Sequence, residues 1–212
     1  MNQLIKVCGM TRVEDVANCE ELGADFLGFI FHPSSPRCVD AEFVRSVEVT
    51  KAKKVGVFVK QSAAEIREIM KNAKLDFAQL HGGQNEEFCK AIGKERVIKV
   101  LWPQRYDSVK EFQDDIDRFA PFCSYMLFDA GSSGGGHGKT LDFSVFSEVK
   151  IQIPWLLAGG LSSKNLLEAI SSAKPDGVDL NSGVEVSPGI KDINKLSAAF
   201  VSVHLANKRK KS

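Results

Sequence analysis

The sequence lacks the features that mark several large classes of protein. Its five cysteines are scattered, with no C-x-x-C pair, so we expect neither a disulfide framework nor a structural zinc site. The 28 lysines and arginines nearly balance the 27 aspartates and glutamates, and a net charge of +1 gives no overall attraction to nucleic acid or membranes. No acidic residues and histidines show the spacing of metal ligands either. Any binding of phosphate must therefore come from a local site.

Long apolar segments are also absent. The start of the chain, MNQLIKVCGM, has neither the apolar run nor the cleavage site of a secretory signal, and no stretch approaches the ~20 apolar residues of a membrane-spanning helix. We therefore expect a soluble cytoplasmic protein with no membrane or nucleic-acid partner. A hydrophobic content of 43% is enough for a sizeable core, which excludes a disordered chain.

Short apolar segments alternate with segments of helical periodicity along the chain. Segments rich in branched or aromatic residues predict strands, and segments with apolar residues three or four positions apart predict helices. The predicted strands are 4–8, 26–30, 54–59, 76–80, 97–101, 125–129, 155–158 and 177–181. The predicted helices are 12–22, 40–50, 62–73, 85–92, 107–119, 143–149, 164–172 and 191–205.

This alternation predicts a single α/β domain, a (β/α)8 or TIM barrel. The 212 residues divided among eight units leave about 26 residues each, which is enough for a strand, a helix and short loops but not for a second domain. Strands joined through helices run parallel, and eight such units can close into a ring. An open doubly wound sheet is the alternative, but CGMT, not GxGxxG, follows the first strand. We expect the barrel over residues 1–206 and a basic, disordered tail over 207–212.

Two side chains are predicted to face each other at the mouth of the barrel. Side chains alternate along a strand, so Leu4, Lys6 and Cys8 share the inner face of the first strand, and Leu127 and Asp129 that of the sixth. Cys8 and Asp129 each end their strand, where the active sites of such barrels lie. A base on one side and an acid on the other suit proton transfer. Alternatively, Cys8 is an inert buried thiol, and Asp129 caps the next loop or pairs with Lys6.

Three loops at this end contain glycine. Gly159 and Gly160 follow the seventh strand, and Ser182 and Gly183 follow the eighth. Glycines let backbone amides approach an anion, and these two loops often bind phosphate in barrels, although each pair is also typical of a simple turn. The sequence GSSGGGHGK at 131–139 predicts a mobile lid or an ordinary flexible connection.

Two further side chains are candidates for substrate binding. Arg37, after the second strand, can hold both oxygens of a substrate carboxylate with its planar, forked guanidinium. His81, after the fourth strand, can donate a hydrogen bond at the mouth. The alternatives are a solvated surface arginine and a loop histidine with no part in binding.

Seven motifs extend over nearly the whole chain. They are IKVCGMTRVEDV, GADFLGFIFHPSSPRCV, VGVFV, QLHG, LFDA followed by GGGHGKTLDFS, LLAGGLSSKNL and VDLNSGVEVSPGIKD. In this order they resemble the phosphoribosylanthranilate isomerase family, whose barrel is of the ribulose-phosphate-binding type. The sequence differs from the family pattern at Asn181, where many relatives have serine, and at His137, where threonine is frequent.

The resemblance implies an isomerase of tryptophan biosynthesis. Its reaction is the Amadori rearrangement of N-(5-phosphoribosyl)anthranilate to 1-(2-carboxyphenylamino)-1-deoxyribulose 5-phosphate, with no metal or organic cofactor, in a monomer. The family's general base then falls on Cys8 and its general acid on Asp129. Arg37 would hold the anthranilate carboxylate, Asp179 would contact a ribose hydroxyl, and the two glycine loops would hold the phosphate. Cys8 then needs either a lowered pKa or the help of a cationic imine.

Two other functions remain open. Another phosphosugar isomerase or synthase on the same barrel, such as one acting on an aminoimidazole nucleotide, would be expected to use paired acidic residues, whereas the first strand here ends in Cys8. A non-catalytic barrel that senses a phosphorylated metabolite would bind its ligand without turnover.

Overall fold

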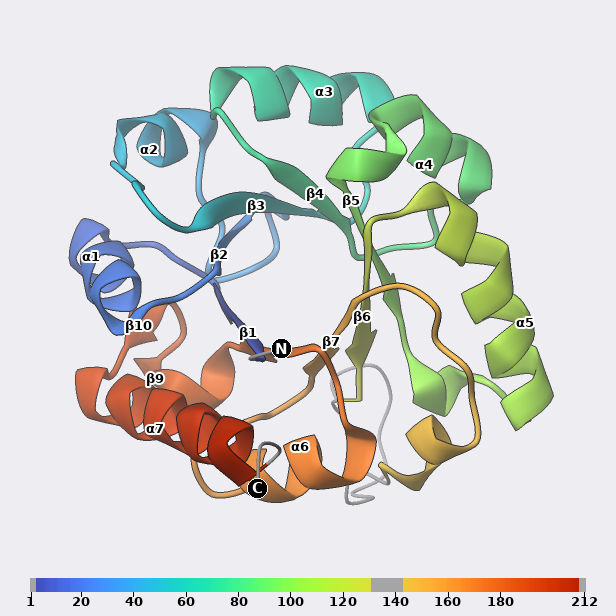
Figure 1. Cartoon of the computed structure of the whole chain (residues 1–212). Coiled ribbons are helices and arrows are strands. Elements are labelled where there is room, and N and C mark those ends of the chain that lie inside the picture. Colours follow the sequence, from blue (N-terminus) through green and yellow to red (C-terminus); the bar gives the residue numbers. More distant parts are fainter. Residues whose placement is uncertain (1–2, 131–142, 210–212) are drawn as a thin grey trace.

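Eight parallel strands close into a barrel, and helices surround it (Figure 1). The computed structural model describes residues 3–130 and 143–209. Each strand pairs with the next one along the chain, and the last pairs with the first, so the ring has no exposed edge. The strands are β1 (Leu4–Cys8), β2 (Phe26–Ile30), β3 (Lys53–Phe58), β4 (Phe77–Leu80), β5 (Val97–Leu101), β6 (Tyr125–Asp129), β7 (Trp155–Ala158) and β8 (Gly177–Leu180). The closed ring confirms the predicted barrel and excludes the open sheet.

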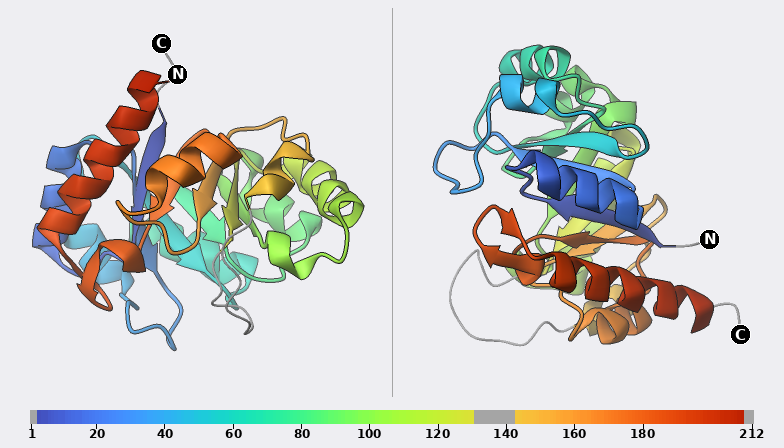
Figure 2. Two further views of the ribbon diagram at one scale, coloured as in Figure 1. Left: turned by 90° about the horizontal axis from the view of Figure 1, so that it is seen from below. Right: turned by 90° about the vertical axis from the view of Figure 1, so that its left-hand side faces the viewer.

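The α-helices of the described residues cover the outside of the ring (Figures 1 and 2). They are α1 (Val13–Leu22), α2 (Ala41–Ser46), α3 (Ala63–Asn72), α4 (Glu86–Ile92), α5 (Val109–Phe119), α6 (Leu166–Ala173) and α7 (Ile193–Arg209). The helix predicted over 143–149 is wrong, because this segment holds only the 3-10 helix η5 (Ser144–Ser147). There the Phe146 ring stacks on Trp155 with centroids 4.9 Å apart, which covers β7 without a longer helix.

The end of the chain differs from the prediction in two ways. A small antiparallel hairpin, β9 (Glu185–Ser187) with β10 (Ile190–Lys191), precedes α7 and was not predicted from the sequence. Helix α7 also continues to Arg209, so it includes the start of the segment expected to be a tail. The reason is Asn207, whose side-chain oxygen accepts a 2.9 Å hydrogen bond from the buried backbone N–H of Gln3. Residues 210–212 lie outside the described part.

Aromatic side chains fill the amino-terminal end of the barrel. Phe26, Phe77 and Tyr125 begin β2, β4 and β6, and their rings meet edge to face with centroids 5.5–5.8 Å apart. Above them the inner layer continues with apolar residues such as Ile98 and Leu127, while residues such as Val7 face the helices. Because side chains pack the amino-terminal end, any binding site must lie at the carboxyl ends of the strands.

Side chains cap the starts of four helices. Asp40, Ser62, Asn85 and Ser108 each accept a hydrogen bond from the backbone N–H three residues further on, and Ser62 forms a reciprocal capping box with Glu65. A cap of this kind contributes about 1 kcal/mol, so these residues fix where the helices begin. Within the described residues, every helix is too short or too polar to cross a lipid bilayer.

Candidate active site

A cavity of about 270 Å³ opens at the carboxyl ends of the strands. The strand ends supply most of its wall, and α/β barrels place their active sites at this end. The structure places most of the predicted residues on this wall: Cys8, His81, Asp129, Gly159, Gly160, Asp179 and Ser182. Arg37 and Gly183 do not line the cavity, and the loop that contains His137 lies outside the described residues.

Cys8 and Asp129 reach the cavity from separate parts of the ring. Cys8 ends β1 and Asp129 ends β6, and β7 and β8 lie between these strands on one side. Burial raises the pKa of the Cys8 thiol, with Lys6 and Lys191 opposing the rise. The free site therefore does not supply the lowered pKa that is one route to a basic thiolate. Of the two routes expected from the sequence, the one left is stabilisation of the thiolate by a positively charged substrate intermediate.

Gly28 makes room for the Cys8 sulfur. It pairs with Cys8 across β1 and β2, and a Cβ at this position would lie only 2.7 Å from Sγ. A side chain here would displace the sulfur, so glycine in this strand is a requirement of the site. The sequence contains a signal for this contact, since a glycine inside a strand often marks the close approach of another group.

A buried ion pair lies near Cys8 and contributes Asp179 to the wall of the cavity. Lys6 Nζ lies 2.9 Å from Asp179 Oδ1, and the two side chains are 0% and 7% exposed. Burial alone would lower the pKa of Lys6, but Asp179 and Cys8 hold it above its ordinary value, so the lysine is charged. The alternative pairing of Lys6 with Asp129 is wrong, because closure of the ring sets Lys6 directly beside Asp179 in register.

His81 lies next to Asp129. Its Nε2 is 3.8 Å from Asp129 Oδ2, its Nδ1 is 3.3 Å from the Gln79 amide nitrogen, and its ring meets Trp102 edge to face. Burial, with the nearby charge of Lys6, lowers the pKa of His81 to about 4, so the ring is neutral at neutral pH. With Nδ1 accepting from the Gln79 amide, the ring proton is on Nε2 and points to the side of Asp129.

The two predicted phosphate loops lie side by side at the mouth. Gly159 and Gly160 have positive φ angles of 109° and 63°, a conformation that glycine adopts most easily. A Cβ at Gly183 would be 2.1 Å from the Leu161 carbonyl oxygen, so Gly183 lets the loop after β8 pack directly on the loop after β7. Gly183 therefore brings the loops together, and Ser182 faces the cavity.

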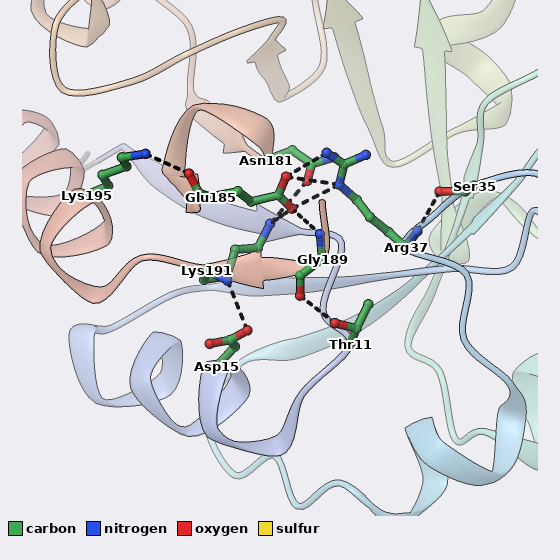
Figure 3. Close-up of polar contacts among 9 residues, drawn as sticks. All are labelled: Thr11, Asp15, Ser35, Arg37, Asn181, Glu185, Gly189, Lys191 and Lys195. Atoms are coloured by element: carbon green, nitrogen blue, oxygen red, sulfur yellow. Dashed lines mark hydrogen bonds and ion pairs between the residues drawn. The ribbon is translucent and has the colours of Figure 1, made fainter. Parts of the chain in front are cut away.

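Arg37 is held by a residue that the sequence analysis missed. Its Nε and Nη2 donate to the Glu185 carboxylate at 2.9 and 2.6 Å, and Lys191 Nζ binds the same carboxylate at 2.8 Å (Figure 3). Arg37 Cδ would lie 2.7 Å from a Cβ at Gly9, the residue after Cys8. Arg37 thus crosses the rim beside Cys8, and a buried acid on β9 fixes its guanidinium there.

In the described part of the chain, no three histidine, cysteine or acidic side chains are grouped so that they could bind a metal. The chemistry of the described site is that of a thiol, carboxyl groups, an imidazole and fixed positive charges.

The sequence matches a known family over most of its length. Residues 5–202 match the family model described as N-(5'phosphoribosyl)anthranilate (PRA) isomerase. The chain belongs to this family. An N-(5'-phosphoribosyl)anthranilate isomerase of Maridesulfovibrio salexigens is 71% identical over 203 residues, which are 96% of this chain and 99% of the relative. As a member of the N-(5'-phosphoribosyl)anthranilate isomerase family, the chain is an isomerase of tryptophan biosynthesis, which confirms the expectation from the sequence motifs.

Solved structures agree with this assignment to the isomerase family. The phosphoribosyl anthranilate isomerase of Thermotoga maritima superposes with a TM-score of 0.83 at 30% identity, over 96% of this chain and 99% of that one. Another phosphoribosyl anthranilate isomerase, solved in complex with reduced 1-(o-carboxyphenylamino)-1-deoxyribulose 5-phosphate, has a TM-score of 0.79 at 28% identity over the same shares of the two chains.

Proposed function

We propose that this isomerase uses Cys8 as general base and Asp129 as general acid in an Amadori rearrangement of N-(5-phosphoribosyl)anthranilate. The observation that carries this proposal is that both side chains line one cavity of about 270 Å³ from separate strands of the ring. Asp129 protonates the ribose ring oxygen, and the ring opens to an imine. Cys8 then removes the proton from the second ribose carbon, and the resulting enolamine tautomerises to the ketone.

The protons of this sequence balance between the two groups. The cycle starts from the Cys8 thiol and the Asp129 carboxylic acid. Asp129 gives its proton to the ring oxygen, and the Cys8 thiol then passes its own proton through water to the Asp129 carboxylate. The resulting thiolate takes the proton from the second ribose carbon, so both groups return to their starting states. Since burial raises the pKa of Cys8, the positive charge of the imine stabilises the thiolate when it is needed.

The substrate is held at its two anionic groups and along its ribose. The loops of Gly159, Gly160, Ser182 and Gly183 hold the phosphate, and Arg37 holds the anthranilate carboxylate. Asp179 and His81 contact the ribose portion from the wall of the cavity. No cofactor takes part in these steps, and activity is expected to survive dialysis against a chelator.

The decay of phosphoribosylanthranilate fluorescence, measured with purified protein, tests the proposed roles. We expect Cys8→Ala and Asp129→Asn each to lower kcat by about two to four orders of magnitude, as for the loss of a general acid or base. Near-normal turnover in either variant would refute the role of that residue. Binding of the substrate without turnover by the unmodified protein would instead identify a metabolite sensor.

We also propose that the protein works as a monomer in the cytoplasm. One similar structure, at 30% identity, is of monomers generated from a dimeric phosphoribosylanthranilate isomerase of Thermotoga maritima, so sedimentation equilibrium is the direct test. Cell fractionation tests the location.

A further inference from the structure

The guanidinium of Arg37 is fixed along one edge only. Nε donates to both oxygens of Glu185, at 2.9 and 3.2 Å, and Nη2 donates to Oε2 at 2.6 Å. Among the described residues, Nη1 has no hydrogen-bond partner, and Figure 3 shows this nitrogen turned away from Glu185. An arginine gripped along the Nε edge still offers its outer edge to a second carboxylate.

Glu185 is itself held firmly. It is 3% exposed, and its Oε1 accepts hydrogen bonds from Lys191 Nζ at 2.8 Å and from the backbone N–H of Gly189 at 3.1 Å. Burial would raise its pKa, but the bonds from Arg37 and Lys191 keep it below the ordinary value, so Glu185 is a carboxylate. The Thr11 hydroxyl binds the Gly189 carbonyl, which ties the β9–β10 hairpin to the start of α1.

The charges of this cluster leave it positive. Glu185 alone would cancel the charge of Arg37 and weaken its attraction for an anion. Lys191 is 0% exposed and restores the positive charge. The other charged groups drawn in Figure 3 are Asp15 and Lys195, which offset each other, so three cations against two anions give a formal charge of +1.

The cluster also reaches the cavity directly. Lys191 Nζ donates a 3.1 Å hydrogen bond to Asn181 Oδ1, and Asn181 lines the cavity. A Cβ at Gly9 would lie 2.7 Å from both Arg37 Cδ and Asn181 Oδ1, so the arginine stem and the amide flank the same glycine. Asn181 is therefore the link between the buried lysine and the cavity wall.

We propose that Glu185 and Lys191 are positioning residues, which aim the outer edge of Arg37 at the substrate carboxylate and keep the cluster positive. This inference rests on the proposed role of Arg37 and assigns the selectivity for a carboxylated aromatic group to three residues instead of one. Neither Glu185 nor Lys191 touches the reacting atoms, so their loss is expected to weaken binding much more than turnover.

Two ligands that differ only in the carboxyl group provide the test. The first is reduced 1-(o-carboxyphenylamino)-1-deoxyribulose 5-phosphate, and the second is the same compound without its carboxyl group. The ratio of their Kd values measures the preference for the carboxylate, and general damage to the fold cancels in this ratio. Calorimetric titration of each variant with both ligands gives the ratio.

The expected results differ between variants. Arg37→Ala should abolish the preference, and Lys191→Met should lower it roughly tenfold, the worth of a charge-assisted contact. In Glu185→Gln the new amide NH2 meets a donor of Arg37 or Lys191, so the guanidinium turns and the preference also falls. Lys54→Met removes another largely buried lysine, whose Nζ binds the Val44 and Val47 carbonyls, and should leave the ratio unchanged.

The outcomes distinguish the positioning role of Glu185 and Lys191 from the proposed contact between Arg37 and the substrate carboxylate. A wild-type ratio in both Lys191→Met and Glu185→Gln, with a lost preference in Arg37→Ala, would overturn the positioning role alone. A wild-type ratio in Arg37→Ala would show instead that the proposed carboxylate contact is wrong. Glu185→Gln keeps the size of the side chain, so it decides the question even where Lys191→Met does not fold.

Discussion

Replacing Gly28 with alanine places a methyl group against the Cys8 sulfur. The new Cβ would lie 2.7 Å from Sγ, 3.0 Å from Cα and 3.1 Å from Cβ of Cys8. Ordinary contact begins at ~3.5 Å, so the sulfur or the strand must move by ~1 Å. Overpacking of this kind costs about 1–3 kcal/mol of stability, and a displacement of ~1 Å at a reacting group costs up to ~100-fold in rate.

Two measurements and a matched control test this reasoning. Urea unfolding gives the loss of stability, and the fluorescence decay of the substrate gives kcat. Gly56→Ala in β3 is the control, since its Cβ would lie 2.5 Å from Leu75 Cδ1, among residues on the helix side of the barrel. Both variants should lose stability, but only Gly28→Ala should lose turnover.

The double variant adds an internal check. In Cys8→Ala with Gly28→Ala the sulfur is gone, so the closest contact is relieved and part of the lost stability should return. The contacts at 3.0 and 3.1 Å remain, so the recovery is partial. If Gly28→Ala alone folds as stably and turns over as fast as the unmodified protein, the crowding argument for this strand pair is refuted.

Two further predictions concern stability. Burial lowers the pKa of the His81 ring from 6.5 to about 4, so between these pH values the unfolded chain binds a proton that the folded chain does not. The contribution of His81 to the free energy of unfolding is therefore complete above pH 6.5 and is lost as the pH falls toward 4. His81→Gln should therefore flatten this acid limb in urea titrations, and an unchanged slope would contradict the assigned pKa. Asn207→Ala leaves the buried N–H of Gln3 without its partner and should cost about 1–3 kcal/mol. Equal unfolding curves for Asn207→Ala and the unmodified protein would show that the last turn of α7 is not held in this way.

Local patterns were sufficient to predict the barrel, because each strand is an apolar run of the right length and the alternation along it fixes which side chains face inward. Cys8 and Asp129 were placed at the mouth by this rule alone. The β9–β10 hairpin was missed because its strands have only three and two residues, too few for any periodicity. The motif around Pro188 and Gly189 gave the only turn signal there.

Partners across the ring could not be predicted in the same way. Lys6 and Asp179 are far apart in sequence and meet only because β8 closes onto β1 in one register. Arg37 was identified as a cation, but the buried Glu185 that holds it has no pattern around it that predicts burial. Such contacts depend on the closure of the ring and on how loops from separate strands pack, which residue spacing does not encode.

The charges around the cavity are arranged unequally, and this asymmetry bears on the two proposed catalytic groups. Lys6 and Lys191 lie on the side of Cys8, and both oppose the rise of its pKa. On the side of Asp129, burial keeps the ring of His81 neutral, with a pKa of about 4. An imidazolium 3.8 Å from the Asp129 carboxylate would stabilise the ionised acid and make it a weaker proton donor. Burial of His81 thus favours the role of Asp129 as proton donor, while the buried lysines favour the role of Cys8 as base. The same protein interior therefore supports opposite roles for the two groups.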